Sequence, residues 1–194
     1  MKYRNGLKTK QNIVDEAFHL FAQQGYEATS IDQIMKRLGR TKGTFYAHFR
    51  SKEELFVEIM NQRMRSQHRM IEKEWHEYED KENGWRFVEE MIQKLIKYAQ
   101  AEDWISMFFE FVAHVEKNPD VRAHMLQMYE EWRSFLSRFF AMFQEKGLLK
   151  KEIDPTLLAT SLIAVFDGFN LQYHVNQKID PFRQIEFIRH FFTN

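Results

Sequence analysis

The chain has 194 residues, no cysteine, and 28 Lys/Arg against 28 Asp/Glu, so its formal net charge is zero. The length suffices for a buried core, and the absence of cysteine excludes disulfides, thiolate metal sites and cysteine nucleophiles. Because the longest apolar stretch without a charge covers only residues 155–166, and a bilayer span takes about 20 residues, we expect a soluble cytoplasmic protein.

The zero net charge hides an uneven distribution along the chain. Residues 1–52 carry ten Lys/Arg and four Asp/Glu, whereas the remaining residues carry eighteen and twenty-four. A basic N-terminal part on an acidic body is typical of a protein whose one end contacts nucleic-acid phosphates; a chance excess is the alternative. Arg4, Lys8 and Lys10 could form a basic arm that reaches DNA, or a solvated tail.

The first apolar segment predicts a helix over residues 5–24 that ends at Gly25. Thr29 and Asp32 form a T-x-x-D capping box, which predicts that a second helix begins at Thr29. Gly39 provides the backbone freedom of a following turn. Apolar residues recur in the second helix at the spacing of one helical face: Ile31, Ile34, Met35 and Leu38.

Thr41 is a good N-cap for a third, short helix that ends at about Phe49. At about 100° per residue, Phe45 and Phe49 share one face, which we expect to be buried. Gly43 and Ala47 lie on the opposite face, whose centre is therefore nearly bare. The edges of that outward face carry hydrogen-bonding side chains: Lys42, Thr44, Tyr46 and His48. Such a face suits a helix that enters the DNA major groove.

Ser51 and Glu54 form a further capping box, S-x-x-E, which predicts a long helix from Ser51 to about Asp80. Lys52 lies in its first turn, where the helix dipole and the ammonium group together could bind a phosphate. Residues 29–52 are thus typical of a helix-turn-helix, and an ordinary αα-hairpin with a solvated face is the alternative.

From Ile13 to about Leu55 the chain resembles the tetracycline-repressor (TetR) family of bacterial transcription regulators. The resemblance rests on the runs LFAQQGYEATS, IDQIMKRLG, RTKGTFYAHF and SKEEL. It implies a homodimer with an N-terminal DNA-binding domain and a variable, all-helical C-terminal domain that holds an effector pocket. We place the first domain at residues 1–52 and the second at residues 53–194.

The resemblance also implies which positions contact DNA. They correspond here to Thr29, Thr41, Lys42, Thr44, Tyr46, His48 and Lys52. We add the neighbouring Ser30 and Gly43, and Arg40, where family members usually carry a small apolar residue and where an arginine could contact a phosphate.

The three prolines divide the rest of the chain, because each follows Asn or Asp, and proline at the first helical position is a helix-start signal. These pairs are Asn118-Pro119, Asp154-Pro155 and Asp180-Pro181. The predicted helices cover residues 83–101, 103–116, 119–146, 155–176 and 181–192. Gly147 ends the third of them. No alternating strand pattern with hairpin dipeptides is present, so the predicted fold class is all-α.

Two of these helices are rich in aromatic residues that could line an effector pocket, although such stripes also form plain core. The candidate ligand-binding residues are Trp104, Met107, Phe108, Phe111, His114, Trp132, Phe135, Phe139, Phe166 and Asn170. Glu110 and Tyr173 could also orient a ligand. Aromatic walls with a few polar groups suit a hydrophobic or amphipathic small molecule, such as a planar aromatic cation or a fatty acyl chain.

Apolar stripes also mark the last two predicted helices. In the TetR family the last two long helices form the dimer interface as a four-helix bundle, so the resemblance implies the same role here; intramolecular packing is the alternative. The candidate interface residues are Leu158, Leu162, Val165, Phe169, Tyr173, Phe182, Ile185, Ile188 and Phe192. Gly168 costs about 1 kcal/mol relative to alanine within a helix, which is explicable if another backbone crosses it closely.

The leading hypothesis is a ligand-responsive repressor that binds a palindromic double-stranded DNA operator. An α-helical enzyme is the second hypothesis, but the sequence has no nucleophile elbow, phosphate-binding glycine loop or H-E-x-x-H motif. Glu110 with His114 and Asp120 with His124 are spaced like ordinary surface pairs. We therefore predict no catalytic residue, metal or cofactor. A nonspecific architectural DNA binder is the third hypothesis, which the acidic C-terminal body disfavours.

Overall fold

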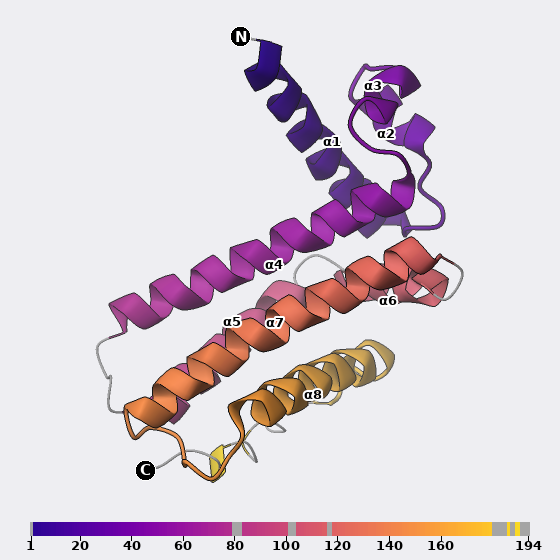
Figure 1. Cartoon of the computed structure of the whole chain (residues 1–194). Helices are drawn as coiled ribbons and strands as arrows, with labels where there is room; N and C mark the ends of the chain where they lie inside the picture. The colour runs from indigo at the N-terminus through magenta and orange to yellow at the C-terminus, as the bar shows by residue number, and fades with distance from the viewer. Residues whose placement is uncertain are drawn as a thin grey trace. The chain divides into compact units, whose positions relative to one another are not determined.

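The computed structural model describes residues 2–78, 83–100, 104–115, 118–179, 186, 189 and 190, with the side chains of 2–5, 99, 100, 114 and 115 excepted. Within these ranges the regular structure is helical and contains no β-strand, which confirms the predicted all-α class. Figure 1 shows the helices α1 (Lys2–Gln24), α2 (Ile31–Arg37), α3 (Lys42–Tyr46), α4 (Lys52–Glu77), α5 (Gly84–Gln100), α6 (Trp104–Val115), α7 (Pro119–Glu145) and α8 (Pro155–Val175).

The helices belong to two compact units. The first contains residues 1–63 and 102–126, and the second contains residues 64–101 and 127–194. The long helices α4 and α7 each contribute to both units. The first unit therefore combines α1, α2 and α3 with α6, although more than fifty residues separate α3 from α6 along the chain. The domain boundary between residues 52 and 53 remains a prediction.

The N-terminus of α2 differs from the prediction by one residue. Ser30, and not Thr29, is the N-cap: its hydroxyl accepts a hydrogen bond from the Gln33 amide at 3.2 Å, and the Gln33 side chain accepts one from the Ser30 amide at 2.7 Å. Thr29 cannot act as the cap because its buried hydroxyl donates to the Gly25 carbonyl oxygen at 2.8 Å. The T-x-x-D pattern is therefore not the capping box.

The turn before α3 forms as the sequence predicts. Gly39 has φ +62°, a backbone conformation that side-chain-bearing residues rarely adopt. Thr41 is the N-cap of α3, and its hydroxyl accepts a hydrogen bond from the Thr44 amide at 3.4 Å. The helix is shorter than predicted, since it ends at Tyr46 with Ala47 as its C-cap.

The core of the first unit is aromatic and includes one residue of α6. The Phe56 and Phe111 rings stack with centroids 4.1 Å apart, and the Tyr26 ring meets both edge-on at 5.2 and 5.3 Å. Phe56 and Phe111 are fully buried and Tyr26 nearly so. Edge-to-face and stacked pairs add stability beyond the apolar area they bury, so this cluster holds α6 against α4 and the end of α1.

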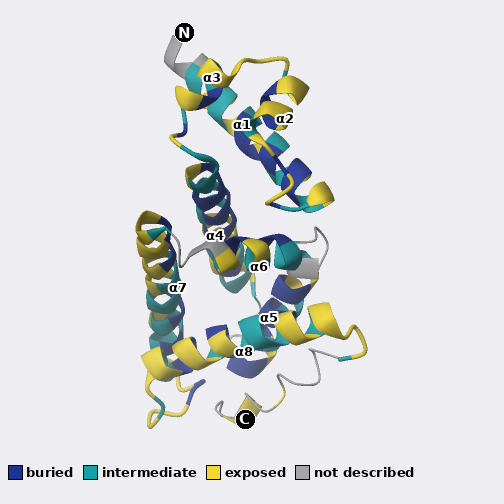
Figure 2. Ribbon diagram, turned by 90° about the vertical axis from the view of Figure 1, so that its right-hand side faces the viewer, coloured by how far each residue is buried: buried dark blue, intermediate teal, exposed yellow. Residues whose placement is uncertain are grey.

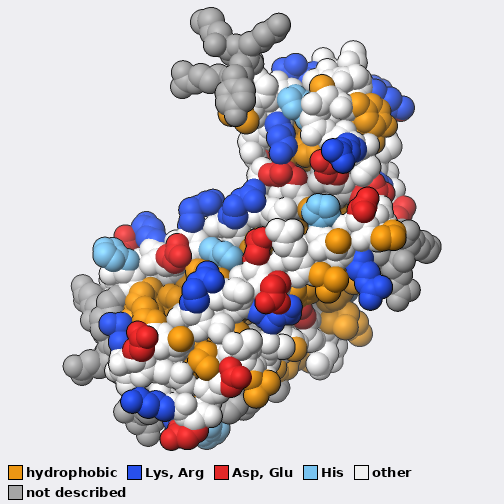
Figure 3. All heavy atoms as spheres, in the orientation of Figure 1, with side chains coloured by type: hydrophobic (Ala, Val, Ile, Leu, Met, Phe, Trp, Pro, Cys, Tyr) orange, Lys and Arg blue, Asp and Glu red, His pale blue; other side chains and the backbone are white. Residues whose placement is uncertain are grey.

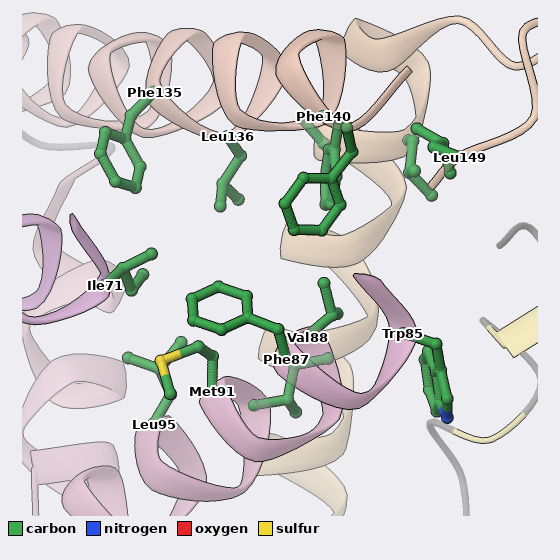
Figure 4. Packing of buried hydrophobic residues seen from close by; sticks show 14 of the residues in the cluster. Ile71, Trp85, Phe87, Val88, Met91, Leu95, Phe135, Leu136, Phe140 and Leu149 are labelled. Atoms are coloured by element: carbon green, nitrogen blue, oxygen red, sulfur yellow. The ribbon is translucent and has the colours of Figure 1, made fainter. Parts of the chain in front are cut away.

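The core of the second unit lies among α4, α5, α7 and α8. In Figure 4, Phe135, Leu136 and Phe140 of α7 point toward Phe87 and Met91 of α5. Burial of this apolar surface is the main stabilising contribution to the unit.

The C-terminal helices begin where the Asx-Pro pairs predict. The Asn118 side chain accepts hydrogen bonds from two amides of the first turn of α7, and the Asp154 side chain does the same for α8. Helices α7 and α8 begin at the predicted residues and end one residue before the predicted bounds. Residues 101–103, 116 and 117, which adjoin α5 and α6, lie outside the described residues. Asp180-Pro181 and the predicted helix over residues 181–192 lie outside the described residues or are described only in part. No described helix combines the length and apolarity needed to cross a membrane.

Candidate nucleic-acid interface

Among the described residues, no side chain covers the outward face of α3. Phe45 and Phe49 are buried, with 0% and 2% of their surface exposed, whereas Gly43 and Ala47 are exposed. The helical spacing predicts this arrangement, and the burial confirms it. A Cβ built on Gly43 would meet only the Thr41 hydroxyl, at 3.6 Å. The backbone of α3 is therefore accessible to a large partner.

Tyr46 and Lys42 flank this bare centre. The Tyr46 side chain is 56% exposed, and its ring stands perpendicular to the Phe45 ring at 5.3 Å. The Lys42 ammonium group pairs with the Asp32 carboxylate at 2.8 Å, and this hydrogen bond raises the pKa of Lys42. Both side chains are well exposed, so the pair can exchange for a phosphate contact at little cost. Figure 3 shows lysine and arginine side chains spread over the surface of the first unit.

An open groove runs beside α3 and contains part of the predicted DNA-contacting set. It is lined by Glu27, Thr29, Ser30, Ile31, Asp32, Lys42, Tyr46 and Lys52. The other predicted residues lie outside this lining: Arg40, Thr41, Gly43, Thr44 and His48. Of these, Arg40, Thr41 and Gly43 are exposed, and Thr44 and His48 are half-buried.

Thr29 and Lys52 serve the protein's own loop. Although Thr29 borders the groove, it has no exposed surface of its own. The Lys52 ammonium group donates to the carbonyl oxygens of Tyr26 and Thr29 at 2.8 and 3.1 Å and lies 4.2 Å from the centroid of the Tyr26 ring. Partial burial lowers the pKa of Lys52. Two of its three N–H donors are thus used within the protein, which the sequence could not reveal because these partners lie more than twenty residues away.

The predicted ligand-binding residues divide between the two compact units. Trp104, Met107, Phe108 and Phe111 belong to the first unit, and Trp132, Phe135, Phe139, Phe166 and Asn170 belong to the second. Met107 and Phe111 are buried in the core of the first unit. The His114 side chain lies outside the described residues.

Asn170 and Phe166 of α8 are linked by a hydrogen bond within their own helix, and Phe166 adjoins a small cavity. Asn170 is buried, and its amide group donates to the Phe166 carbonyl oxygen one turn earlier at 2.8 Å. A cavity of about 10 Å³ adjoins Phe166 and is lined by Ile92, Ile96, Leu162, Val165, Phe166 and Phe169. This volume accommodates about one water molecule, so an effector that bound there would have to displace side chains.

His68, which is not among the residues predicted from the sequence to form a site, packs against aromatic rings of the second unit. Its ring lies nearly parallel to those of Trp132 and Phe135, with centroids 4.5 and 4.0 Å away. Burial lowers the pKa of His68 to about 4, so the imidazole is neutral at pH 7. A histidine at a polar position of a predicted helix carries no sequence signal for this packing.

A second unpredicted pair in the same unit is Tyr129 with Asp167. The Tyr129 hydroxyl donates to the Asp167 carboxylate at 2.9 Å. Burial raises the pKa of both groups, and the hydrogen bond lowers that of Asp167 in part.

The stripe on α8 that was predicted to mediate dimerisation faces inward at several positions. Leu158 is buried in the core of the second unit, and Leu162 and Phe169 pack against that core. Val165 and Tyr173 are half-buried. Phe182, Ile185, Ile188 and Phe192 lie outside the described residues.

A different face of α8 is exposed, as Figure 2 shows along much of the helix. Its large apolar residues are Leu157, Leu171 and Val175, with 64%, 46% and 80% of their surface exposed. A Cβ built on Gly168 would meet no atom within 4 Å. The expected close crossing of another backbone is therefore absent among the described residues of this chain.

Two family models match the chain. The model of bacterial regulatory proteins of the tetR family matches residues 13–59, which include α2 and α3. The model of the C-terminal domain of BetI-type transcriptional repressors matches residues 86–194, which is more than half of the chain.

Individual relatives agree with these matches. The transcriptional repressor AcnR of Corynebacterium glutamicum is 26% identical over 165 residues, which cover 83% of this chain and 79% of that protein. The transcriptional regulator AcrR of Shigella flexneri is 48% identical over 52 residues, which cover 27% of this chain and 24% of that protein. The structure of the fatty acid degradation regulator FadR from Bacillus halodurans has the same fold, with a TM-score of 0.72, 19% identity, and coverage of 91% of this chain and 90% of that one.

Proposed function

The chain belongs to the TetR family of bacterial regulatory proteins, and we propose that it is a homodimeric repressor that a small molecule releases from a palindromic operator. The family and the relatives are DNA-binding transcriptional regulators and not enzymes.

The observation that carries the proposal is the free outward face of α3. A helix with small residues at the centre of one face brings its backbone close to base edges in the major groove, which admits one helix. Gly43 and Ala47 provide this centre. On the opposite side of the helix, Phe45 and Phe49 are buried within the first unit. The same exposure would be unexpected in a helix that only filled the core.

Side chains around α3 have two kinds of role in this proposal. Tyr46, Thr44 and His48 lie at the edges of the bare centre, where they can meet bases. Arg40 and Lys42 carry charges that suit phosphates, which position the helix without reading sequence. The exposed hydroxyls and the bare backbone beside them complete the surface: Ser30, Thr41 and Gly43. Thr29 and Lys52 act indirectly, by holding the loop that precedes α2.

The proposed dimer uses the exposed apolar face of α8. Leu157, Leu171 and Val175 would lose contact with water when a second copy covers them, and open space around Gly168 permits close helix approach. A twofold dimer places two α3 helices about 34–36 Å apart in successive major grooves, which is why we propose a palindromic operator.

The proposed effector is hydrophobic or amphipathic and binds among the C-terminal helices, within residues 53–194. The aromatic cluster around Trp132 and Phe135 supports this class, because aromatic walls suit apolar ligands. One structural relative, FadR, is by its name a regulator of fatty acid degradation. To change the protein from mostly bound to mostly free, the effector must favour the released conformation by about 5.5 kcal/mol.

Selection of duplexes from a randomised double-stranded pool tests the DNA-binding part of the proposal. We expect the wild-type chain to enrich a palindrome, with binding that weakens as salt increases. Tyr46→Ala should change the preferred bases beside the α3 contact, because a good base contact contributes about 1–3 kcal/mol of discrimination.

Lys151→Ala provides the control, since this exposed residue follows α7 and lies outside the α3 surface. It should select the same palindrome as the wild type. If the wild-type chain enriches no sequence at any concentration that gives dimers, the proposed function is wrong.

A further inference from the structure

We propose that Glu110 of α6 is a positioning residue for DNA recognition, because its carboxylate holds the loop from which α2 and then α3 begin. The inference rests on the proposed DNA-binding function. It gives α6 a role in DNA recognition, whereas the sequence pattern suggested that Glu110 orients a ligand.

The carboxylate of Glu110 contacts bare backbone at the end of α1. One of its oxygens accepts a hydrogen bond from the Tyr26 amide at 2.8 Å and from the Glu27 amide at 3.4 Å. A Cβ added to Gly25 would lie 2.9 Å from each carboxylate oxygen, and Gly25 has φ +88°. Only glycine therefore leaves room for the carboxylate at this position, and the charged acceptor makes the contact stronger than a neutral hydrogen bond.

The opposite side of the same loop is held by Lys52. Its ammonium group donates to the carbonyl oxygens of Tyr26 and Thr29 at 2.8 and 3.1 Å. The Thr29 hydroxyl also donates to the Gly25 carbonyl oxygen at 2.8 Å. The loop thus has its amides bound by α6 and its carbonyls bound by α4. Ser30, the next residue, caps α2, so the position of the loop sets where α2 begins.

The helix that carries Glu110 is itself held in place, because α6 packs within the first unit. Phe111, the residue after Glu110, is buried against Phe56 and Tyr26. At the beginning of α6, the Arg63 guanidinium lies 4.9 Å from the centroid of the Phe18 ring and 4.4 Å from that of Trp104. A shift of α6 would consequently move the Glu110 carboxylate, and with it the amides of the loop.

A comparison of Glu110→Ala with Glu110→Gln separates the hydrogen bond from the charge. Both variants remove the same negative charge, but glutamine keeps a carbonyl oxygen that can accept from the loop amides. The full-length chain is used throughout, with the duplex that the wild type selects and a scrambled duplex of equal length. Glu145→Ala, which removes an exposed carboxylate at the end of α7, is the matched control.

We expect Glu110→Ala to accelerate hydrogen exchange at the Tyr26 and Glu27 amides. It should also weaken binding to the selected duplex about three- to tenfold, which is about the net contribution of one typical hydrogen bond. Binding to the scrambled duplex should not weaken. Glu110→Gln should retain most of the amide protection and most of the affinity for the selected duplex. Glu145→Ala should match the wild type in all three measurements.

Two outcomes would overturn the inference. In the first, Glu110→Ala accelerates exchange but binds the selected duplex as tightly as the wild type. In the second, Glu110→Ala and Glu110→Gln weaken both duplexes equally, which would indicate a general loss of folding or charge. If the wild type selects no duplex, the proposed function fails, whereas the exchange measurement still reports whether Glu110 holds the loop.

Discussion

The imidazole of His68 packs flat against aromatic rings, and its Nε2 atom is buried with no hydrogen-bond partner within the described part of the chain. Burial lowers the pKa of His68 to about 4, with a smaller opposing effect of Glu131 and a smaller reinforcing effect of Arg138. In an unfolded chain the pKa of histidine is about 6.5. The unfolded state therefore binds a proton before the folded state does as the pH falls.

This difference predicts that the free energy of unfolding decreases between about pH 6.5 and pH 4, because protonation favours the unfolded chain in that window. His68→Phe keeps a ring that can stack but cannot titrate, so it should lose less stability than the wild type between pH 7 and pH 5. Urea unfolding at the two pH values measures this. His19→Phe alters an exposed histidine and should retain the wild-type loss; an equal loss in His68→Phe would contradict the assignment.

At the scale of single elements, α8 is apolar on two opposite sides. Leu158 is 3% exposed and belongs to the core, whereas its neighbour Leu157 is 64% exposed. A helix of this kind gives no clear amphipathic signal, so the periodicity of its sequence identifies a stripe without showing which surface covers it. The start of α8 is better defined, since Asp154 and Pro155 together fix its first turn.

Asp154→Ala should reduce the free energy of unfolding by about 1 kcal/mol, because the first-turn amides of α8 lose their acceptor. The Asp154 carboxylate accepts from the amides of Thr156 and Leu157 at 2.7 and 3.3 Å. Urea unfolding measures the effect. Asp120→Ala is the control, because Asp120 lies in the first turn of α7 without being its cap, and it should cost much less; equal costs would show that the cap is unimportant.

At the scale of the whole molecule, operator recognition in the proposed manner requires two copies of the chain. One α3 contacts too few bases to select a site in a genome, and a twofold dimer doubles the contacts and fixes their spacing. The exposed apolar residues of α8 are the described feature that best fits the required interface.

Leu171→Glu combined with Val175→Glu should convert the proposed dimer to a monomer, because covering these positions would then bury unpaired charges. Sedimentation velocity gives the oligomeric state, and the affinity for the selected palindrome should fall with it. Leu126→Glu is the matched control, since Leu126 is 61% exposed on α7, and this variant should remain dimeric. A double variant that still dimerises would remove α8 from the interface.

The sequence alone determined the helical class, the helix starts at Asn118-Pro119 and Asp154-Pro155, and the bare outward face of α3. These features depend on local chemistry: proline and capping side chains act on the next turn, and the helical period places Phe45 opposite Gly43. The resemblance of residues 13–55 to the TetR family was specific for a similar reason, because the residues that carry it lie close together in the sequence.

Only the tertiary structure decided what distant residues do for one another. Thr29, Lys52 and Glu110 each carry a polar group that could face a partner, but all three hold the loop between α1 and α2. The partner of Thr29 is a carbonyl oxygen in the same loop, whereas the partners of Lys52 and Glu110 lie between 23 and 84 residues away in the sequence. Periodicity reports which residues share a face, whereas the packing of other helices determines whether that face meets protein or solvent.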